Sequence, residues 1–236
     1  MKIAFYGDSL TAGIPGVSYF NILRQRLPEH ELLNFGQPDD TVLSLYQRIV
    51  EDDLLEPVDL AFVWIGTNDI PQELDGFVGL MRRLWRKFRS QNPGEFKEYY
   101  RALLELLTPY APHLVTVSPL LNGEDLSNYR NRYLARLGRI VRDVSGEYAG
   151  VEYLDVRALF VERLAGRRPT QWQASVANTL RDTLLRTEEE IDERALERGL
   201  SLTLDGVHLN SVGARIVADA FEQVIERVAA ARQHEA

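Results

Sequence analysis

The chain alternates between short, almost wholly apolar runs and longer stretches in which apolar residues recur every three or four positions. The short runs read as strands covered on both faces; they lie at residues 1–6, 31–35, 58–65, 113–117 and 150–154. The longer stretches between them have helical spacing. Strands that alternate with helices predict an α/β protein with a parallel sheet, right-handed crossovers and helices on both faces.

Capping residues give several of the helix boundaries. Ser18 suits the N-cap of a helix from 19 to about 27, and Pro28 stops it. Thr41 begins an amphipathic helix, and a long helix is expected from 126 to about 145, between the fourth and fifth strands.

Two helical stretches exceed what the crossovers of such a sheet need. The first, at about 71–95, has an apolar stripe and a basic opposite face. It suits a helix packed on the core, a lid over the loop at Asn68, or a contact with an anionic surface. The second, at about 156–200, carries capping boxes that begin at Thr170 and Thr187, the latter starting a helix that ends at a glycine. It suits a cap over the pocket or a dimer surface.

Composition narrows the class of protein. A length of 236 residues suits one domain over 1–236. The net charge of -8 argues against a nucleic-acid partner, which would need a basic face. The absence of cysteine excludes disulfides and a thiolate nucleophile, and the four histidines have no metal-binding spacing, so no metal is expected.

The first strand begins without leader features and no apolar run is long enough to span a membrane, so we expect a cytoplasmic protein.

Candidate chemistry lies at two distant places. The first strand ends at Gly7, and Asp8 and Ser9 follow at the edge where open α/β sheets bind ligands. Alone, these residues are slightly more typical of a turn and a helix cap than of a catalytic site. Near the C-terminus, Asp205 stands three residues before His208. His208 could be a helix-start residue, but an acid at this spacing can hold the imidazole through Nδ1–H and leave Nε2 as a base.

Four short motifs, taken in order, resemble the four sequence blocks of the SGNH (GDSL) hydrolase family. They are Gly-Asp-Ser-Leu at 7–10, Gly36 after the second strand, Gly-x-Asn-Asp at 66–69 and Asp-x-x-His at 205–208. The resemblance spans nearly the whole chain. It implies a flavodoxin-like, three-layer α/β/α sandwich with a five-stranded parallel sheet.

The resemblance also implies a role for each matching residue. Ser9 would be the nucleophile, His208 the general base and acid, and Asp205 the residue that orients the imidazole. The oxyanion hole would comprise the backbone N–H groups of Ser9 and Gly36 and the side-chain amide of Asn68. No metal or cofactor is implied.

We therefore expect a serine esterase that hydrolyses small, short-chain acyl esters through an acyl-enzyme. A carbohydrate O-acetylesterase or an acyltransferase would use the same residues, and a non-catalytic binding protein of the same fold is a more distant alternative. A nucleotide-binding Rossmann protein is disfavoured because GxGxxG spacing is lacking after the first strand. A homo-oligomer is possible, but nothing in the sequence indicates one.

Overall fold

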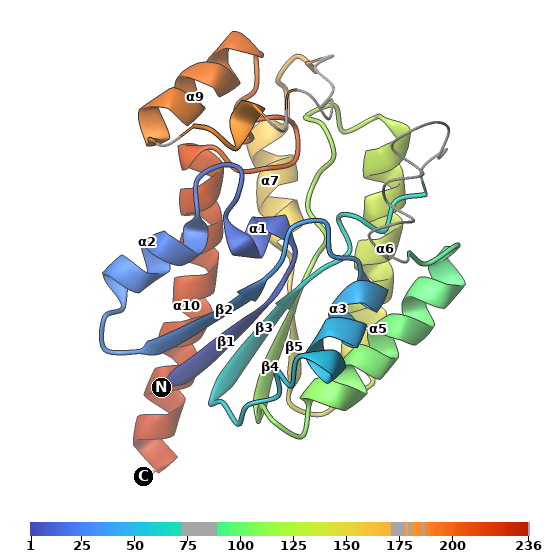
Figure 1. Cartoon of the computed structure of the whole chain (residues 1–236), viewed down its shortest axis with the longest axis vertical. Helices are drawn as coiled ribbons and strands as arrows, with labels where there is room; N and C mark the ends of the chain where they lie inside the picture. The colour runs from blue at the N-terminus through green and yellow to red at the C-terminus, as the bar shows by residue number, and fades with distance from the viewer. Residues whose placement is uncertain (72–88, 171–177, 179–180, 186, 236) are drawn as a thin grey trace.

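A single parallel sheet forms the centre of the molecule (Figure 1). The computed structural model describes residues 1–71, 89–170, 178, 181–185 and 187–235. The strand order is β2-β1-β3-β4-β5, with every neighbouring pair parallel. The strands are β1 (Lys2–Gly7), β2 (Glu31–Gly36), β3 (Leu60–Trp64), β4 (His113–Val117) and β5 (Val151–Leu154). This is the flavodoxin-like order, so the predicted fold class is confirmed.

Helices connect the strands, and several begin where the capping residues predict. They are α1 (Ser9–Ala12), α2 (Tyr19–Arg26), α3 (Val42–Glu51), α5 (Pro93–Leu107), α6 (Tyr129–Ser145), α7 (Val156–Leu164), α9 (Glu188–Glu197) and α10 (Ser211–Glu235). The Ser18 side chain caps α2, and Thr41 caps α3 in a full capping box. Helix α6 starts slightly later than predicted because Asn128 accepts the N–H of Asn131 and so caps it.

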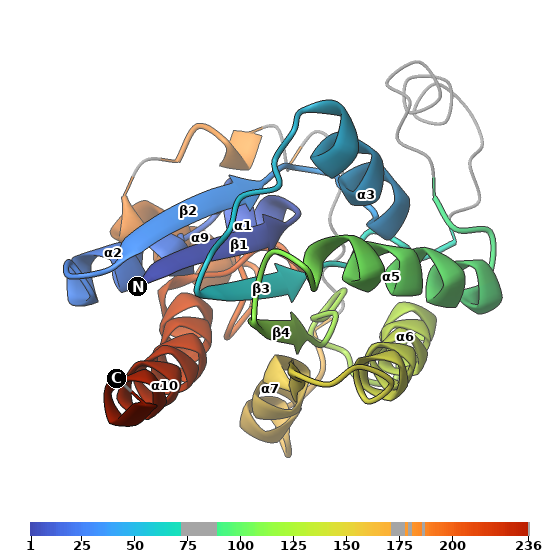
Figure 2. The same cartoon turned by 90° about the horizontal axis from the view of Figure 1, so that it is seen from below.

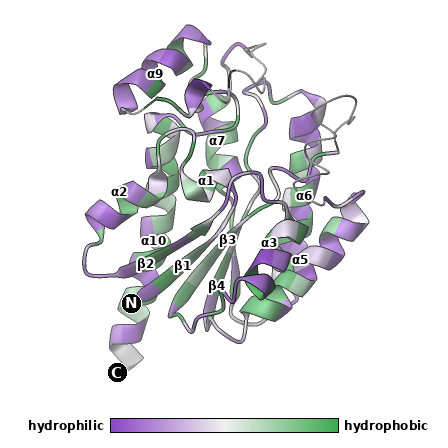
Figure 3. Cartoon of the chain, in the orientation of Figure 1, coloured by the Kyte–Doolittle hydropathy of each residue, from purple (hydrophilic) through white to green (hydrophobic). Residues whose placement is uncertain are grey.

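The helices form a layer on each face of the sheet. Helices α3, α5 and α6 lie on one face, and α2, α7 and α10 lie on the other (Figure 2). The strands are the most continuously hydrophobic part of the fold, and polar residues gather on the outer sides of the helices (Figure 3). Two buried cores therefore exist, one on each face of the sheet.

The C-terminal helix α10 is fixed directly on the sheet by aromatic stacking. Phe221 of α10 stacks on Phe62 of β3 with ring centroids 4.5 Å apart, and Phe62 stacks on Phe5 of β1 at 5.1 Å. All three side chains are buried. Helix α10 begins three residues after position 208. Its packing on the sheet therefore helps to place the 205–208 motif.

The two predicted helical additions are described only in part. The apolar stripe within 71–95 and the helix predicted after Thr170 lie mostly outside the described residues. The capping box at Thr187 is present and starts α9. Helix α7 opens the second stretch and buries one face in the core. None of the described helices combines the length and apolarity needed to cross a membrane.

Candidate active site

Strand β1 and the short helix α1 position Ser9 at the carboxyl edge of the sheet. Asp8 is a capping residue, as its position after the strand suggests: it caps one helical turn, and its Oδ1 accepts the N–H of Leu10 at 2.9 Å. Ser9 is the first residue of that turn, so its N–H has no acceptor within the helix. Only 6% of Ser9 is exposed. The turn thus holds the Ser9 hydroxyl and N–H together at the end of a central strand.

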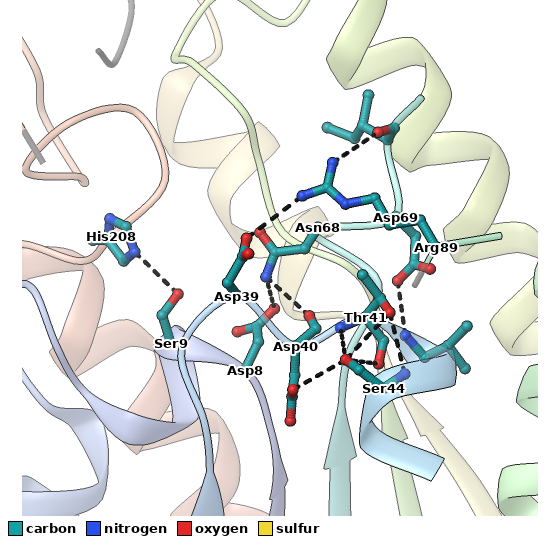
Figure 4. A network of polar contacts seen from close by, with 12 residues as sticks. Asp8, Ser9, Asp39, Asp40, Thr41, Ser44, Asn68, Asp69, Arg89 and His208 are labelled. Carbon is teal, nitrogen blue, oxygen red and sulfur yellow. Dashed lines mark hydrogen bonds and ion pairs between the residues drawn. The ribbon is translucent and has the colours of Figure 1, made fainter. Parts of the chain in front are cut away.

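Asp205 shapes its own loop and binds the imidazole of His208. Its Oδ1 accepts the backbone N–H groups of Val207 at 3.0 Å and His208 at 2.9 Å. Its Oδ2 lies 2.8 Å from Nδ1 of His208. The opposite ring nitrogen, Nε2, lies 3.0 Å from the Ser9 hydroxyl (Figure 4). The structure therefore brings together three predicted residues from the two ends of the chain.

The interaction between His208 and Asp205 favours a protonatable imidazole beside an ionised carboxylate. Burial alone would lower the pKa of His208, but attraction to Asp205 and the hydrogen bond between them raise it above its ordinary value. Burial would raise the pKa of Asp205, but His208 and two backbone N–H groups hold it below the ordinary value. Asp205 therefore stabilises a positive charge on the ring without itself taking the proton.

The amide of Asn68 is held by two acceptors, one of them on Asp8, the residue before Ser9. Its Nδ2 donates to the Asp40 carbonyl oxygen at 3.0 Å and, in a longer contact of 3.4 Å, to Asp8 Oδ2 (Figure 4). Burial raises the pKa of Asp8 to about 7. Next to Asn68, Asp69 accepts the N–H of Val42, and burial raises the pKa of Asp69 to about 6. Buried carboxyl groups therefore shape the loops that carry Ser9 and Asn68.

Gly36 has a packing role that its sequence motif does not indicate. Its N–H donates to Asn34 Oδ1 at 2.9 Å, and Asn34 Nδ2 donates to the Thr11 carbonyl oxygen at 2.8 Å. A Cβ at position 36 would come within 2.2 Å of Ala12 N. The glycine lets β2 approach α1 closely. The Gly36 N–H, which the family resemblance assigns to an oxyanion hole, is thus donated to Asn34. The one sequence signal for this bond is the amide of Asn34 in an otherwise largely apolar strand.

Asp39, which no motif in the sequence singles out, lies next to Asn68 (Figure 4). Its φ is 65°, in the left-handed region that few residues other than glycine adopt. Its carboxylate pairs with Arg89, Oδ1 to Nη2, at 3.5 Å. The Pro38-Asp39 pair is a turn signal in the sequence, but the sequence does not say that this turn borders the site.

A serine hydroxyl, an imidazole and a carboxylate, bonded in that order at the carboxyl edge of a parallel sheet, form the type of site that serine hydrolases use. The model of the GDSL-like lipase/acylhydrolase family matches residues 5–216. The chain belongs to this family and is a hydrolase that acts on ester bonds.

Solved structures share the fold at low sequence identity. The acetyl xylan esterase AlAXEase is 20% identical, with a TM-score of 0.64 over 95% of this chain and 100% of its own. A mutant of Axe2, an acetyl-xylooligosaccharide esterase from Geobacillus stearothermophilus, is 21% identical, with a TM-score of 0.65 over 94% and 92%. LAE5, an α/β hydrolase from the metagenome of Lake Arreo, is 20% identical, with a TM-score of 0.63 over 93% and 92%. No curated protein sequence matches the chain significantly.

Proposed function

We propose that this chain is a serine esterase that cleaves short-chain acyl esters through an acyl-enzyme intermediate. The observation that carries the proposal is the continuous pair of contacts from Ser9 Oγ to His208 Nε2, 3.0 Å, and from His208 Nδ1 to Asp205 Oδ2, 2.8 Å. A hydroxyl within hydrogen-bond reach of a base, which a third group orients, is the signature of an activated nucleophile.

The proposed reaction has two halves. Ser9 Oγ attacks the ester carbonyl carbon while His208 Nε2 takes its proton, and the tetrahedral intermediate collapses as His208 gives that proton to the departing alcohol. Water then attacks the acyl group on Ser9, again with His208 as the base, and releases the acid and the free hydroxyl. Asp205 keeps the ring orientation and stabilises the imidazolium in both halves.

The negative oxygen of the intermediate needs donors. The Ser9 N–H, which has no acceptor within α1, and the Asn68 amide are the donors we assign. The longer contact of Asn68, 3.4 Å to Asp8, is the weaker of its two bonds, so that hydrogen is the one we expect to turn to the oxyanion. Gly36 stays a prediction as a third donor, because its N–H would first have to leave Asn34 Oδ1.

A carbohydrate O-acetylesterase is the second candidate, and the names of the structural relatives favour it. Two are described as esterases of acetylated xylan or xylooligosaccharides. In Axe2, substitutions of a serine, an aspartate and a histidine are described as catalytic mutants, with the aspartate three positions before the histidine. Asp205 and His208 have the same spacing, which supports the same assignment here.

The test is hydrolysis of p-nitrophenyl esters from acetyl to long acyl chains by wild type, Ser9→Ala and His208→Ala. Both variants should lose at least about 10³-fold in kcat, because nucleophile and base act as one unit. His113→Ala, an exposed histidine at the start of β4, is the matched control and should behave as wild type. Full activity in Ser9→Ala would rule out the proposed nucleophile.

The two substrate classes are separated by comparing kcat/KM on p-nitrophenyl acetate and on acetylated xylooligosaccharides. A clear preference for the sugar ester supports the second candidate. Transfer of acetyl to an added sugar acceptor, seen by product analysis, would identify an acyltransferase instead.

A further inference from the structure

Glu124 is a buried carboxylate that the proposed reaction does not use. It lies in the loop between β4 and α6, far in sequence from the residues that it contacts, and 7% of it is exposed. Its Oε1 accepts the N–H groups of Leu202 at 2.8 Å and Thr203 at 2.9 Å, and also the Thr203 hydroxyl at 2.8 Å. Its Oε2 accepts the N–H of Ser201 at 2.8 Å. Four hydrogen bonds to one short segment are strong because the acceptor is charged.

The segment that Glu124 binds leads directly into the proposed catalytic loop. The Thr203 hydroxyl, having donated its hydrogen to Glu124, accepts the N–H of Gly206 at 3.1 Å. The Gly206 carbonyl accepts the N–H of Gly123 at 2.7 Å. The loop is thus tied to Gly123 and Glu124 both before and after Asp205.

This loop has little regular structure to hold it. Between α9 and α10 the described ladder is one antiparallel bridge from Thr203 to Leu209. Its two bonds run from Leu204 N–H to the His208 carbonyl, 2.6 Å, and from Asn210 N–H to the Leu202 carbonyl, 3.2 Å. Irregular buried backbone needs side-chain partners for its N–H groups. Glu124 accepts three such N–H groups, those of residues 201, 202 and 203. Glu124 therefore anchors the backbone that leads into Asp205.

We propose that Glu124 is a positioning residue that holds the loop of Asp205 and His208 against Ser9; the inference rests on the function proposed for those three residues. Glu124 does not contact the reacting atoms. It acts through the backbone at 201–206, and its loss displaces the imidazole from the nucleophile. A displacement of about 1 Å at a catalytic group can cost on the order of 10²-fold in rate.

The test compares Glu124→Gln with Asp125→Asn. The glutamine keeps the shape of Glu124 but turns an NH₂ group towards an N–H of the loop, so donor faces donor. Asp125 is the neighbouring acid, and its Oδ1 accepts from Ser127 within its own loop. With p-nitrophenyl acetate, we expect Glu124→Gln to lose about 10²-fold in kcat with little change in KM, and Asp125→Asn to match wild type.

Two further readouts separate positioning from a general loss of stability. The acid limb of kcat/KM should move to lower pH in Glu124→Gln, because a displaced Asp205 no longer supports the charge of His208. Asp8 and Asp182 also act on that ring and are left unchanged. The low-field NMR signal of the His208 Nδ1 proton, identified by its loss in His208→Ala, should weaken in Glu124→Gln and not in Asp125→Asn, and it needs no substrate.

Thr203→Val is the second variant, used if Glu124→Gln does not fold. It removes the hydroxyl that links Glu124 to Gly206 and keeps the backbone bonds, so it should show a smaller effect in the same direction. Wild-type kcat, acid limb and NMR signal in a folded Glu124→Gln or Thr203→Val would overturn the positioning role. An inert wild type, or an active Ser9→Ala, would count against the proposed esterase instead, while the NMR comparison would still test Glu124.

Discussion

Asp205 shows how one residue can fix a loop and orient an imidazole at once. One carboxylate oxygen accepts two backbone N–H groups and the other binds Nδ1 of His208. Because the first oxygen locks the turn, the second needs no movement to meet the ring. The spacing of three residues is what makes both contacts possible, so this part of the site could be predicted from sequence.

The raised pKa of His208 predicts the pH profile of the proposed activity. A protonated ring cannot accept the Ser9 proton, so kcat/KM should fall as the pH drops through the His208 pKa, which lies above the ordinary 6.5. In Asp205→Asn, kcat should fall by about 10⁴-fold, and the acid limb should move to lower pH because the supporting charge is gone. A wild-type limb below 6.5, or one that Asp205→Asn leaves in place, would contradict this assignment.

At the scale of elements, the end of α9 also holds the loop that carries Asp205 and His208. Arg198, at its C-terminal cap, binds Asp182 through Nη1 at 2.7 Å and Nη2 at 2.9 Å. Nη1 also donates to the Leu204 carbonyl at 2.9 Å, next to Asp205. The side chains of Arg198 and Asp182 are only 4% and 1% exposed, so their charges are compensated largely by each other.

Removing one partner of this buried pair should be costly. We expect Asp182→Ala to lower the free energy of unfolding by about 3 to 5 kcal/mol, because Arg198 is left charged in a buried site. Urea denaturation measures the loss. Glu188→Ala, which breaks the exposed pair with Arg215, is the matched control and should cost about 1 kcal/mol or less. Equal effects of the two variants would mean that burial does not decide the strength of the Asp182 pair.

For the whole molecule, buried acids link stability to pH. Burial raises the pKa of Asp8 from 3.8 to about 7 and that of Asp69 to about 6. The folded state therefore holds protons that the unfolded chain would release, and stability falls as pH rises from about 4 through 7. The raised pKa of His208 acts in the same direction, whereas the lowered pKa of Asp205 matters only at more acidic pH.

We expect wild type to have a larger free energy of unfolding at pH 5 than at pH 8, as measured in urea. Between pH 5 and pH 8 the raised pKa of Asp8 alone corresponds to about 3 kcal/mol of the free energy of unfolding. Asp8→Asn keeps an acceptor for Leu10 and removes the titration, so it should flatten this dependence, while the exposed Asp52→Asn should not. A wild type more stable at pH 8, or an unchanged slope in Asp8→Asn, would contradict the role of Asp8.

The sequence by itself determined the strands, the caps at Ser18, Thr41 and Thr187, and the order of the family motifs. These features are local: apolar spacing, a hydroxyl cap or an acid three residues before a histidine depends on neighbours within one turn or strand. The five-stranded parallel sheet follows from their alternation, and it is confirmed.

Only the tertiary structure decided which distant groups meet. Glu124 binds residues 77 to 79 positions away, Gly36 packs closely against Ala12 of α1, and Asp39 borders Asn68. Nothing in the local sequence of these residues differs from that of an ordinary loop acid or strand glycine. Their partners depend on how the two helical layers pack on the sheet, and so on contacts between residues that are remote in the chain.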